Sequence, residues 1–316
     1  MDILCVGLMV ADIIVRPVDR MILERDTIAA DSITFSTGGD AFNAAISLSK
    51  LGVPTGMCGV VGNDPAGSFL VDEARAHEID TSLVRRSVRN ATSTSIVLCE
   101  GSGERHFLYS GKCNGELIED MIPDSFLGET KILYVGSAMA LHGMDGTGLT
   151  ELFRRARRLG VKTVMDATAD SEDKWLAKIE GALPYTDVFF PSYEEAVSIT
   201  GERELSRMAR FMSAYGVGTF GVKLAEKGCF ITDFKAEHVV AAFPCDAQDV
   251  IDTTGAGDAF AAGFLCGMHH GWDLKRCTVF GNAIANFCIR KLGSTTNIPT
   301  FQDALAFMQG KKQYPY

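Results

Sequence analysis

Short apolar runs alternate with amphipathic stretches through the second half of the chain. Each run has the length of a buried strand, and the stretches between them carry apolar residues at helical spacing. This alternation predicts an α/β fold with a doubly wound, mostly parallel sheet and helices on both faces. The predicted strands are 132–136, 162–166, 188–191 and 220–224, and the predicted helices are 149–159, 175–179 and 205–215.

Two segments of the first half, 13–37 and 91–112, interrupt this alternation. The second contains Gly101-Ser102-Gly103 between two apolar runs, which is a hairpin signal, and residues 26–36 favour a short strand pair. We expect the two segments to form a small β-rich lid over the carboxyl ends of the strands, where open α/β sheets bind ligands. The regular elements predicted in this half are the strands 3–10 and 53–61 and the helices 42–51 and 66–77.

The hydrophobic pattern after residue 228 completes a single domain. An antiparallel strand is expected over 228–234, followed by helices over 257–269, 274–291 and 301–309. The chain has neither an internal repeat nor a long linker, and its length is ordinary for one large domain. We therefore expect residues 1–316 to form a single domain into which the lid segments are inserted.

Charge and cysteine usage narrow the class of protein. A net charge of −10 disfavours nucleic acid or an anionic membrane as the main partner, and we interpret the arginines at 154–158 as a solvated helix face. The nine cysteines lack metal-ligand spacing, and Cys5, Cys58, Cys229 and Cys288 are expected in the core. Without a basic N-terminal region or a long apolar run, the protein is expected to be soluble and cytoplasmic.

The segment Asp252–Phe260 carries the most specific chemistry. Gly255 and Gly257 flank Ala256, and an apolar helical run begins directly after Asp258. A glycine turn that leads into a helix directs backbone N–H groups and the positive end of the helix dipole at one point, which suits a phosphate. A carboxylate beside such a site repels an anion, but it can take the proton from an attacking hydroxyl group. The segment therefore indicates a phosphoryl-transfer centre.

Several motifs in order resemble one family. The chain has no Gly-x-x-x-x-Gly-Lys-Ser/Thr motif and no Gly-x-Gly-x-x-Gly after its first strand, which disfavours P-loop NTPases and Rossmann dehydrogenases. The segment 252–260 instead resembles the C-terminal signature of the ribokinase-like (PfkB) carbohydrate kinases. The stretches 38–45, 59–67 and 190–195 resemble the family's double-glycine, Gly-x-x-Gly-x-Asp-x-x-Gly and Asn-x-x-Glu motifs. The resemblance spans nearly the whole chain and implies the ribokinase-like fold.

The resemblance implies roles for the residues of the glycine turn. Asp258 would be the general base, and Gly255, Ala256 and Gly257 would stabilise charge on the transferred phosphoryl group through their backbone N–H groups. The structural alternative is that Asp258 caps the helix that follows it.

Nucleotide and magnesium contacts follow from the same resemblance. Glu195 would organise Mg²⁺ through water, with Ser192 at the position where the family usually has asparagine. Gly228 would lie beside ATP, and Lys223 could face its phosphates. The alternatives are an exposed helix glutamate at Glu195 and a solvated lysine at Lys223.

A monovalent cation site is a further implication of the family pattern. Relatives often bind such an ion beside the anion hole, and here Asp252 and Thr254, with a later loop at 293–295, would surround it. K⁺ is the expected ion.

The acceptor is expected to bind near the N-terminal motifs. Asp12 would accept hydrogen bonds from substrate hydroxyl groups, Gly38 and Gly39 would let the backbone approach the sugar, and Asn43 would add a hydrogen bond. Asp40 stands where some relatives have lysine or a small residue, and it would tune which acceptor fits.

Two further positions concern the choice of substrate. Arg105 lies on the predicted second hairpin and could reach the substrate, although a surface arginine explains it equally well. Where ribokinases place a glutamate, the chain has Ser137-Ala138-Met139, which puts specificity for ribose in doubt.

The sequence therefore predicts an ATP- and Mg²⁺-dependent kinase that phosphorylates a hydroxyl group of a small sugar or sugar acid, and a homodimer. A nucleoside kinase of the same family is the first alternative, for which Phe35, Phe107 or Tyr109 could stack on a base. A non-catalytic sugar- or nucleotide-binding regulator is the second.

Overall fold

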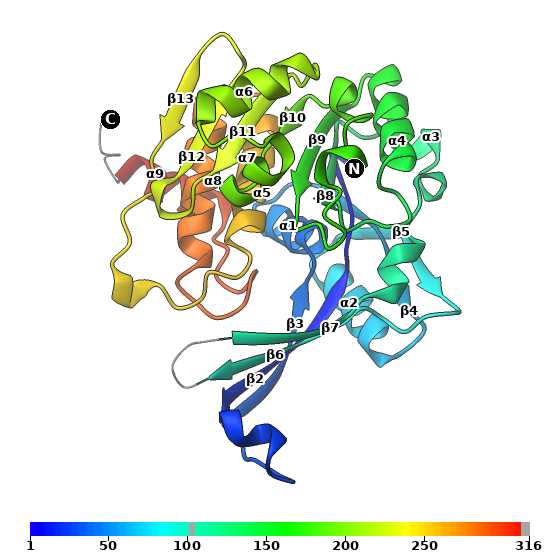
Figure 1. Ribbon diagram of the computed structural model, residues 1–316, viewed down its shortest axis with the longest axis vertical. Coiled ribbons are helices and arrows are strands. Elements are labelled where there is room, and N and C mark those ends of the chain that lie inside the picture. The colour runs from blue at the N-terminus through cyan, green and yellow to red at the C-terminus, as the bar shows by residue number, and fades with distance from the viewer. Residues whose placement is uncertain (101–104, 311–316) are drawn as a thin grey trace.

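The larger sheet of the protein is mostly parallel. The computed structural model describes residues 1–100 and 105–310. Seven neighbouring strands of this sheet, β5, β4, β1, β8, β9, β10 and β11 in spatial order, run parallel to one another. Strand β12 pairs antiparallel with β11 and with β13. The strand order is β13-β12-β11-β10-β9-β8-β1-β4-β5, which confirms the predicted doubly wound architecture (Figure 1). The strands are β1 Ile3–Val6, β4 Thr55–Gly62, β5 Asp80–Ser87, β8 Ile132–Ala138, β9 Lys162–Ala167, β10 Val188–Phe189, β11 Thr219–Lys223, β12 Cys229–Thr232 and β13 Glu237–Val240.

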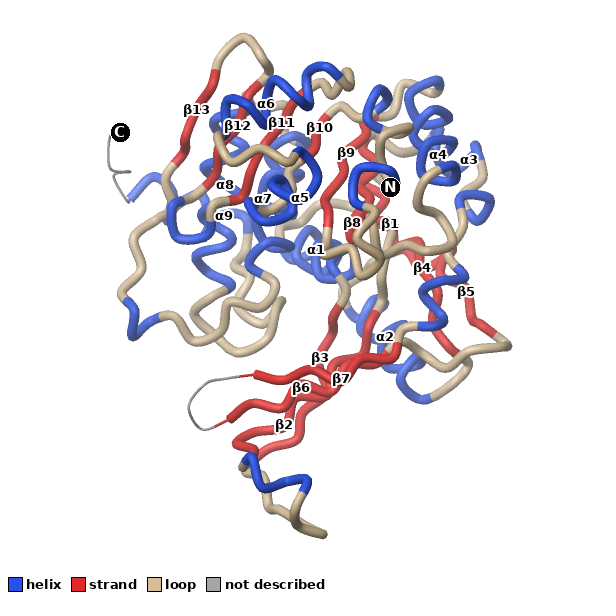
Figure 2. Tube along the Cα trace, viewed as in Figure 1, coloured by secondary structure: helices blue, strands red, loops and turns tan. Residues whose placement is uncertain are grey.

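Helices cover both faces of this sheet (Figure 2). Alternate residues of β1 point to opposite faces: Ile3 and Cys5 belong to one apolar core, and Leu4 and Val6 to the other. The first core is closed by α1 Asp40–Lys50, α2 Pro65–Ala76, α7 Ala256–His269, α8 Leu274–Cys288 and α9 Phe301–Gly310. The second is closed by α3 Asp124–Gly128, α4 Thr147–Arg158, α5 Tyr193–Thr200 and α6 Leu205–Ala214.

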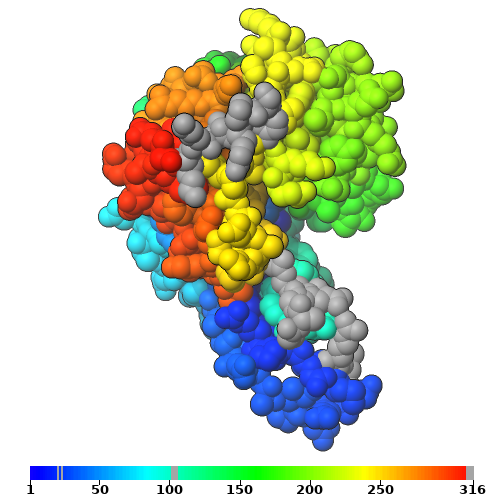
Figure 3. Space-filling view, turned by 90° about the vertical axis from the view of Figure 1, so that its left-hand side faces the viewer, coloured from blue at the N-terminus to red at the C-terminus, as the bar shows by residue number. Residues whose placement is uncertain are grey.

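A smaller sheet projects from the main body (Figures 1 and 3). Its strands are β3 Ser32–Gly38, β2 Val10–Val18, β6 Thr94–Glu100 and β7 Arg105–Ser110, in this spatial order. The two segments that interrupt the strand–helix alternation therefore meet in one β-rich unit, as predicted. The turn Gly101-Ser102-Gly103 lies outside the described residues.

Some element boundaries differ from the sequence-based expectations. The expected strand 3–10 is broken at Gly7, where a Cβ atom would lie 2.5 Å from the carbonyl oxygen of Gly136, and the chain passes there from one sheet to the other. The expected strand pair over 26–36 is wrong, because only β3 forms there. The expected helix over 175–179 is a single 3₁₀ turn, Trp175–Lys178.

Strands β5 and β13 were missed because they lie at the two edges of the sheet. Their exposed positions are largely polar, so neither has the continuous apolar run of a central parallel strand. Helix α5 was also missed. It is short, and its start is marked by a capping box rather than by a long apolar pattern.

The other sequence expectations concern the surface and the thiols. The basic helix face is not fully solvated, because Arg155 is only 13% exposed and bonds Asp124 and the carbonyl oxygen of Ile122. Cys5, Cys58, Cys229 and Cys288 are buried free thiols, as predicted. Among the helices that the structure describes, none has the length and apolarity needed to cross a membrane.

Candidate active site

The glycine turn forms the N-terminus of α7. Gly255 is the N-cap and has a left-handed conformation with φ 77°. A Cβ atom there would lie 2.3 Å from Cβ of Ser294, so this position needs glycine for both backbone and space. Ala256, Gly257 and Asp258 form the first turn of the helix, which places Asp258 inside α7 rather than at its cap. The structural alternative of Asp258 as the helix cap is therefore wrong.

The carboxyl group of Asp258 is held from helix α1. Asn43 Nδ2 donates to Asp258 Oδ2 at 2.8 Å, and α1 packs directly against α7. Burial, reinforced by the charge of Asp40, raises the pKa of Asp258 well above its usual value. Asn43 Oδ1 is buried and has no hydrogen-bond partner among the described residues. The Asp258 carboxyl group therefore has a high proton affinity, and the amide oxygen of Asn43 beside it is a hydrogen-bond acceptor without a donor in the part of the chain that the structure describes.

Asp40 lies in the first turn of α1 and faces the same place. Ser137 Oγ donates to Asp40 Oδ2 at 2.6 Å. Burial raises the pKa of Asp40, while the Ser137 hydrogen bond and the charge of Lys223 oppose that rise. The N-termini of α1 and α7 thus present two neighbouring carboxyl groups, each with a neutral hydrogen-bond donor.

Lys223 brings a positive charge close to the turn. Its Nζ donates to Asp166 Oδ1 and Oδ2 at 2.6 and 2.7 Å, and it lies 3.5 Å from where a Cβ atom of Gly257 would stand. Burial would lower the pKa of Lys223, but Asp166 and Glu195 outweigh burial and raise it. Its side chain is 16% exposed, so the alternative of a solvated lysine is wrong.

Asp166 is a buried carboxyl group that the sequence analysis did not single out. Burial raises its pKa to about 7 even though the Lys223 ammonium group lowers it. The signal that could have identified Asp166 is its place directly after the apolar residues of β9. A polar residue there lies at the carboxyl end of a parallel strand, which is where such sheets bind ligands.

Ser192 and Glu195 start helix α5 with a capping box. Glu195 N donates to Ser192 Oγ at 3.3 Å, and Ser192 N donates to Glu195 Oε2 at 2.7 Å. Both residues also line a cavity of about 1260 Å³. The pair therefore has a structural role in addition to any role toward a ligand.

This larger cavity runs along the carboxyl edge of the large sheet to the N-terminus of α7. Asp40, Asp166, Lys223, Gly257 and Asp258 lie on its wall, which also includes the segment 242–245 after β13 and residues of α8. Gly228, with φ 96°, is also on the wall, and a Cβ atom there would lie 2.1 Å from the carbonyl oxygen of Val240.

A second cavity of about 650 Å³ lies between the small sheet and the loop that precedes α7. Val250 and Thr253 line both cavities, so the two adjoin. Asp12 is on its wall, and burial raises the pKa of this carboxyl group to about 6. A Cβ atom on Gly38 would lie 2.4 Å from Asp12 Oδ2, so the carboxylate lies directly against the Gly38 backbone.

Gly39 and Arg105 complete the residues expected on the acceptor side. Gly39 has φ 93°, and a Cβ atom there would lie 2.3 Å from the carbonyl oxygen of Leu8, which explains the second glycine of the motif. The Arg105 backbone pairs with Cys99 on the small sheet, while its side chain lies outside the described part of the structure. The structure places Asp40 and Asp258 on the larger cavity, whereas Asp12 lines the smaller one.

Asp252 joins the two loops beside Gly255. Its Oδ1 accepts from Thr254 N at 2.9 Å and its Oδ2 from Gly293 N at 3.1 Å, so the carboxylate ties the α7 turn to the loop after α8. Residues 1–100 and 105–310 contain no group of three or more His, Cys, Asp or Glu side chains that is arranged to bind a metal ion.

The Gly-x-x-Gly-x-Asp-x-x-Gly motif at 59–67 has a structural explanation. Asp64 caps α2 by accepting from Gly67 N at 2.8 Å, and its other oxygen accepts from Thr92 N at 2.7 Å. This places the start of the second small-sheet segment against α2. The Gly-x-x-Gly-x-Asp-x-x-Gly run therefore attaches the small sheet to the body.

Comparisons with known proteins identify the family of this chain. Residues 1–301 match the model of the pfkB family carbohydrate kinases. An uncharacterized sugar kinase of Archaeoglobus fulgidus is 28% identical over 82% of this chain and 100% of its own length. The 2-dehydro-3-deoxygluconokinase of Bacillus subtilis is 26% identical over 88% of this chain and 89% of its own.

A solved structure shows the same fold. A putative ribokinase II from E. coli, in complex with ATP and Mg²⁺, superposes with a TM-score of 0.83 at 18% identity and covers 98% of this chain and 99% of its own. The chain belongs to the pfkB family of carbohydrate kinases, phosphotransferases that act on an alcohol group.

Proposed function

We propose that this protein transfers the γ-phosphoryl group of ATP to a hydroxyl group of a small sugar or sugar acid. The observation that carries the proposal is the position of Asp258, half-buried in the first turn of α7 directly after Gly255 and Gly257. Two adjoining cavities near this turn suit a nucleotide and a smaller acceptor. The named activity of the Bacillus subtilis relative supports the inclusion of sugar acids.

Asp258 is proposed to take the proton of the attacking hydroxyl group. The hydrogen bond from Asn43 orients the carboxyl group, and a general base of this kind contributes about 10²–10⁴-fold to the rate. The N–H groups at the start of α7 would receive the phosphoryl charge. Because the N–H of Ala256 donates to the carbonyl oxygen of Thr253 at 3.2 Å, it would have to leave that bond to contribute.

The larger cavity is proposed to hold ATP, with its phosphates toward Lys223 and its base toward Gly228. Phosphate oxygens would compete with Asp166 for the Lys223 ammonium group. Glu195 and Asp166 fit a magnesium ion held through water, because Mg²⁺ prefers carboxylate oxygens and retains several water ligands. Mg²⁺ bound there would neutralise charge on the phosphates. The side chain of Ser192 is already used in the capping box, so its proposed contact to ATP would be a secondary one.

The smaller cavity is proposed to hold the acceptor. Asp12 would accept hydrogen bonds from two neighbouring hydroxyl groups, and the unpartnered Asn43 Oδ1 would accept one near the reacting centre. Movement of the small sheet toward the body would exclude water from this cavity before transfer. The choice among acceptors would then depend on residues that line the small sheet.

K⁺ is proposed to bind at the loops joined by Asp252. The carboxylate already holds the amides of Thr254 and Gly293, so an ion near these loops would bear on the geometry of the Gly255 turn. Turnover should then be higher in KCl than in an equal concentration of tetramethylammonium chloride. Equal rates in the two salts would contradict this part of the proposal.

A second copy of the chain is proposed to cover the outer face of the small sheet. Phe35, Ile13, Ile96 and Leu108 lie side by side across its strands, on the face opposite the acceptor cavity. Phe35 and Leu108 are 60% and 61% exposed, which is unusual for large apolar side chains aligned in one row. Sedimentation velocity should show a dimer that Leu108→Glu converts to a monomer. Val88→Glu, an exposed apolar position off this face, is the matched control, and a monomeric unmodified protein would refute the dimer.

A panel of acceptors in a coupled ADP-release assay tests the proposed function. The panel contains D-ribose, D-fructose, 2-dehydro-3-deoxy-D-gluconate, adenosine and inosine. Acceptor-dependent ADP release with a sugar or sugar acid is the expected result. Turnover only with nucleosides would favour the nucleoside kinase, for which Phe107 on the acceptor cavity could stack on a base. ATP binding without turnover on any compound would favour the non-catalytic regulator.

A further inference from the structure

The end of strand β8 has an unusual backbone. Ser137 and Met139 have φ values of 63° and 83°, a left-handed conformation that non-glycine residues rarely adopt. Both are fully buried, and the pairing of β8 with β9 is interrupted between Val135 and Ala138. Strained backbone of this kind persists only where surrounding contacts hold it, and it is concentrated at functional sites.

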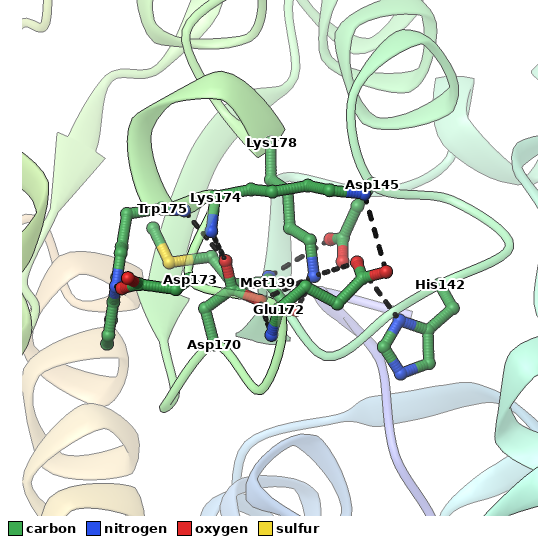
Figure 4. Close-up of polar contacts among 9 residues, drawn as sticks. All are labelled: Met139, His142, Asp145, Asp170, Glu172, Asp173, Lys174, Trp175 and Lys178. Carbon is green, nitrogen blue, oxygen red and sulfur yellow. Dashed lines mark hydrogen bonds and ion pairs between the residues drawn. The ribbon is translucent and has the colours of Figure 1, made fainter.

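Lys178 holds this backbone from the 3₁₀ turn after β9. Its Nζ donates to the carbonyl oxygen of Met139 at 2.8 Å, while the N–H of Met139 donates to Asp145 Oδ1 at 3.0 Å (Figure 4). Both polar groups of the Met139 backbone are therefore bonded to side chains from outside the strand. The left-handed turn is built by long-range contacts.

The lysine is itself fixed by carboxylates. Lys178 Nζ lies 2.7 Å from Asp170 Oδ1 and 2.8 Å from Glu172 Oε2, and the lysine side chain is only 8% exposed (Figure 4). Asp170 also accepts from the backbone N–H groups of Glu172 and Trp175 at 3.0 and 2.7 Å. A buried lysine with this many fixed partners has one position available to it. None of these residues belongs to the machinery proposed above.

The turn ends at the reacting centre. Ser137 Oγ donates to Asp40 Oδ2 at 2.6 Å, and Asp40 lines the same cavity wall as Asp258. Only the left-handed backbone at Ser137 and Met139 separates this hydroxyl group from the Lys178 contact. A lysine 39 positions beyond Met139 therefore contacts the same turn from which Ser137 bonds Asp40.

We propose that Lys178 and Ser137 are positioning residues that hold the Asp40 carboxyl group in place beside Asp258 during phosphoryl transfer. The proposal rests on the proposed kinase function. Lys178 acts by fixing the backbone of Met139, and Ser137 passes that fixed position on to Asp40 through one hydrogen bond. Since a displacement of about 1 Å far from the chemistry can cost about 10²-fold in rate, the effect falls on kcat.

Kinetics of Lys178→Met test the proposal with the panel acceptor that gives the highest kcat/KM in the unmodified protein. We expect kcat to fall by about 10- to 100-fold, while the KM for ATP stays within about twofold. Lys178→Arg should recover part of the loss. Lys174→Met is the matched control, because this lysine lies on the same loop, its side chain is 60% exposed, and among the groups the structure describes its Nζ bonds only Glu172, at 3.4 Å.

Ser137→Ala keeps the test valid if Lys178→Met folds poorly, because it removes a single hydroxyl group. It should lower kcat to a similar extent. The double variant should be little slower than the slower single variant, because both changes act through the same hydrogen bond. Multiplicative losses would show that Lys178 acts independently of the Ser137 hydrogen bond and would overturn the proposal.

Hydrogen–deuterium exchange supplies a measurement that needs no acceptor. Amides of residues 136–146 should exchange faster in Lys178→Met than in the unmodified protein, and not in Lys174→Met. Unchanged exchange, or an unchanged kcat in both Lys178→Met and Ser137→Ala, would overturn the positioning role. A lack of turnover in the unmodified protein would instead overturn the proposed function on which it rests.

Discussion

The two cavities have walls of different origin. The larger one is lined by loops at the carboxyl edge of the large sheet and by helices packed on it, so its shape is fixed by the main core. The smaller one has much of its wall on the projecting small sheet, including Asp12 and Phe107. The proposed nucleotide side is therefore built into the body, whereas the proposed acceptor side depends on where the small sheet lies. Changes on the two sides should have different consequences.

Lys223→Met should give the largest loss of stability, on the nucleotide side. Removal of the ammonium group leaves Asp166 buried without its partner, which costs about 3–5 kcal/mol in comparable pairs. Urea unfolding measures this loss, and Lys227→Met, an exposed lysine of the next turn, is the control. Replacing both members, Lys223→Met with Asp166→Leu, should restore most of the stability. If the double variant is no more stable than Lys223→Met, the pair is not the cause.

Gly38→Ala should affect the acceptor side alone. The added Cβ atom would collide with the Asp12 carboxylate, and overpacking of this kind costs about 1–3 kcal/mol. We expect kcat/KM for the acceptor to fall by about tenfold, with the KM for ATP unchanged. Gly128→Ala, where the added atom meets nothing within 4 Å, should leave both unchanged. An increase in the KM for ATP would mean that the two cavities are not separate.

Asp12→Asn should give the smallest change in stability, and its sign depends on pH. Burial raises the folded-state pKa of Asp12 from 3.8 to about 6, so between these values the folded protein binds more protons than the unfolded chain. Ionised Asp12 therefore costs stability at neutral pH, and this cost disappears below about pH 4. Asp12→Asn should raise the free energy of unfolding by about 1 kcal/mol at pH 7.5 and by less at pH 4.5, while it weakens acceptor binding.

Thermal unfolding at the two pH values checks this prediction. Asp31→Asn, an exposed carboxylate at the rim of the same cavity, is the control and should show no pH-dependent gain. If Asp12→Asn destabilises the protein equally at both pH values, the carboxylate contributes to the fold through contacts rather than through its charge.

The same contrast explains what the sequence could predict. The turn at Gly255–Asp258 and the motif at Gly38–Asn43 are each a continuous run of residues. The need for glycine in their backbones is therefore visible in the sequence itself. The small sheet was also predictable, because its strands interrupt a regular pattern.

The contacts that the sequence did not reveal are long-range. Asp166 on β9 meets Lys223 on β11 across the intervening strand β10, and Ser137 meets Asp40 across 97 positions. The left-handed conformation of Ser137 has no local signal, and the neighbouring Met139 backbone is held by the side chains of Lys178 and Asp145. The polar edge strands β5 and β13 were missed because no apolar face marks them.

The most direct test of the central claim is the rate of phosphoryl transfer in Asp258→Asn. Rapid-quench measurement with saturating ATP and the best panel acceptor should show a loss of at least about 10²-fold in kcat, with ATP affinity by calorimetry unchanged. Asp273→Asn is the matched control, because this aspartate caps α8 through the N–H of Arg276 and asparagine caps equally well. Near-normal turnover in Asp258→Asn would contradict the assignment of Asp258 as the base and with it the proposed mechanism.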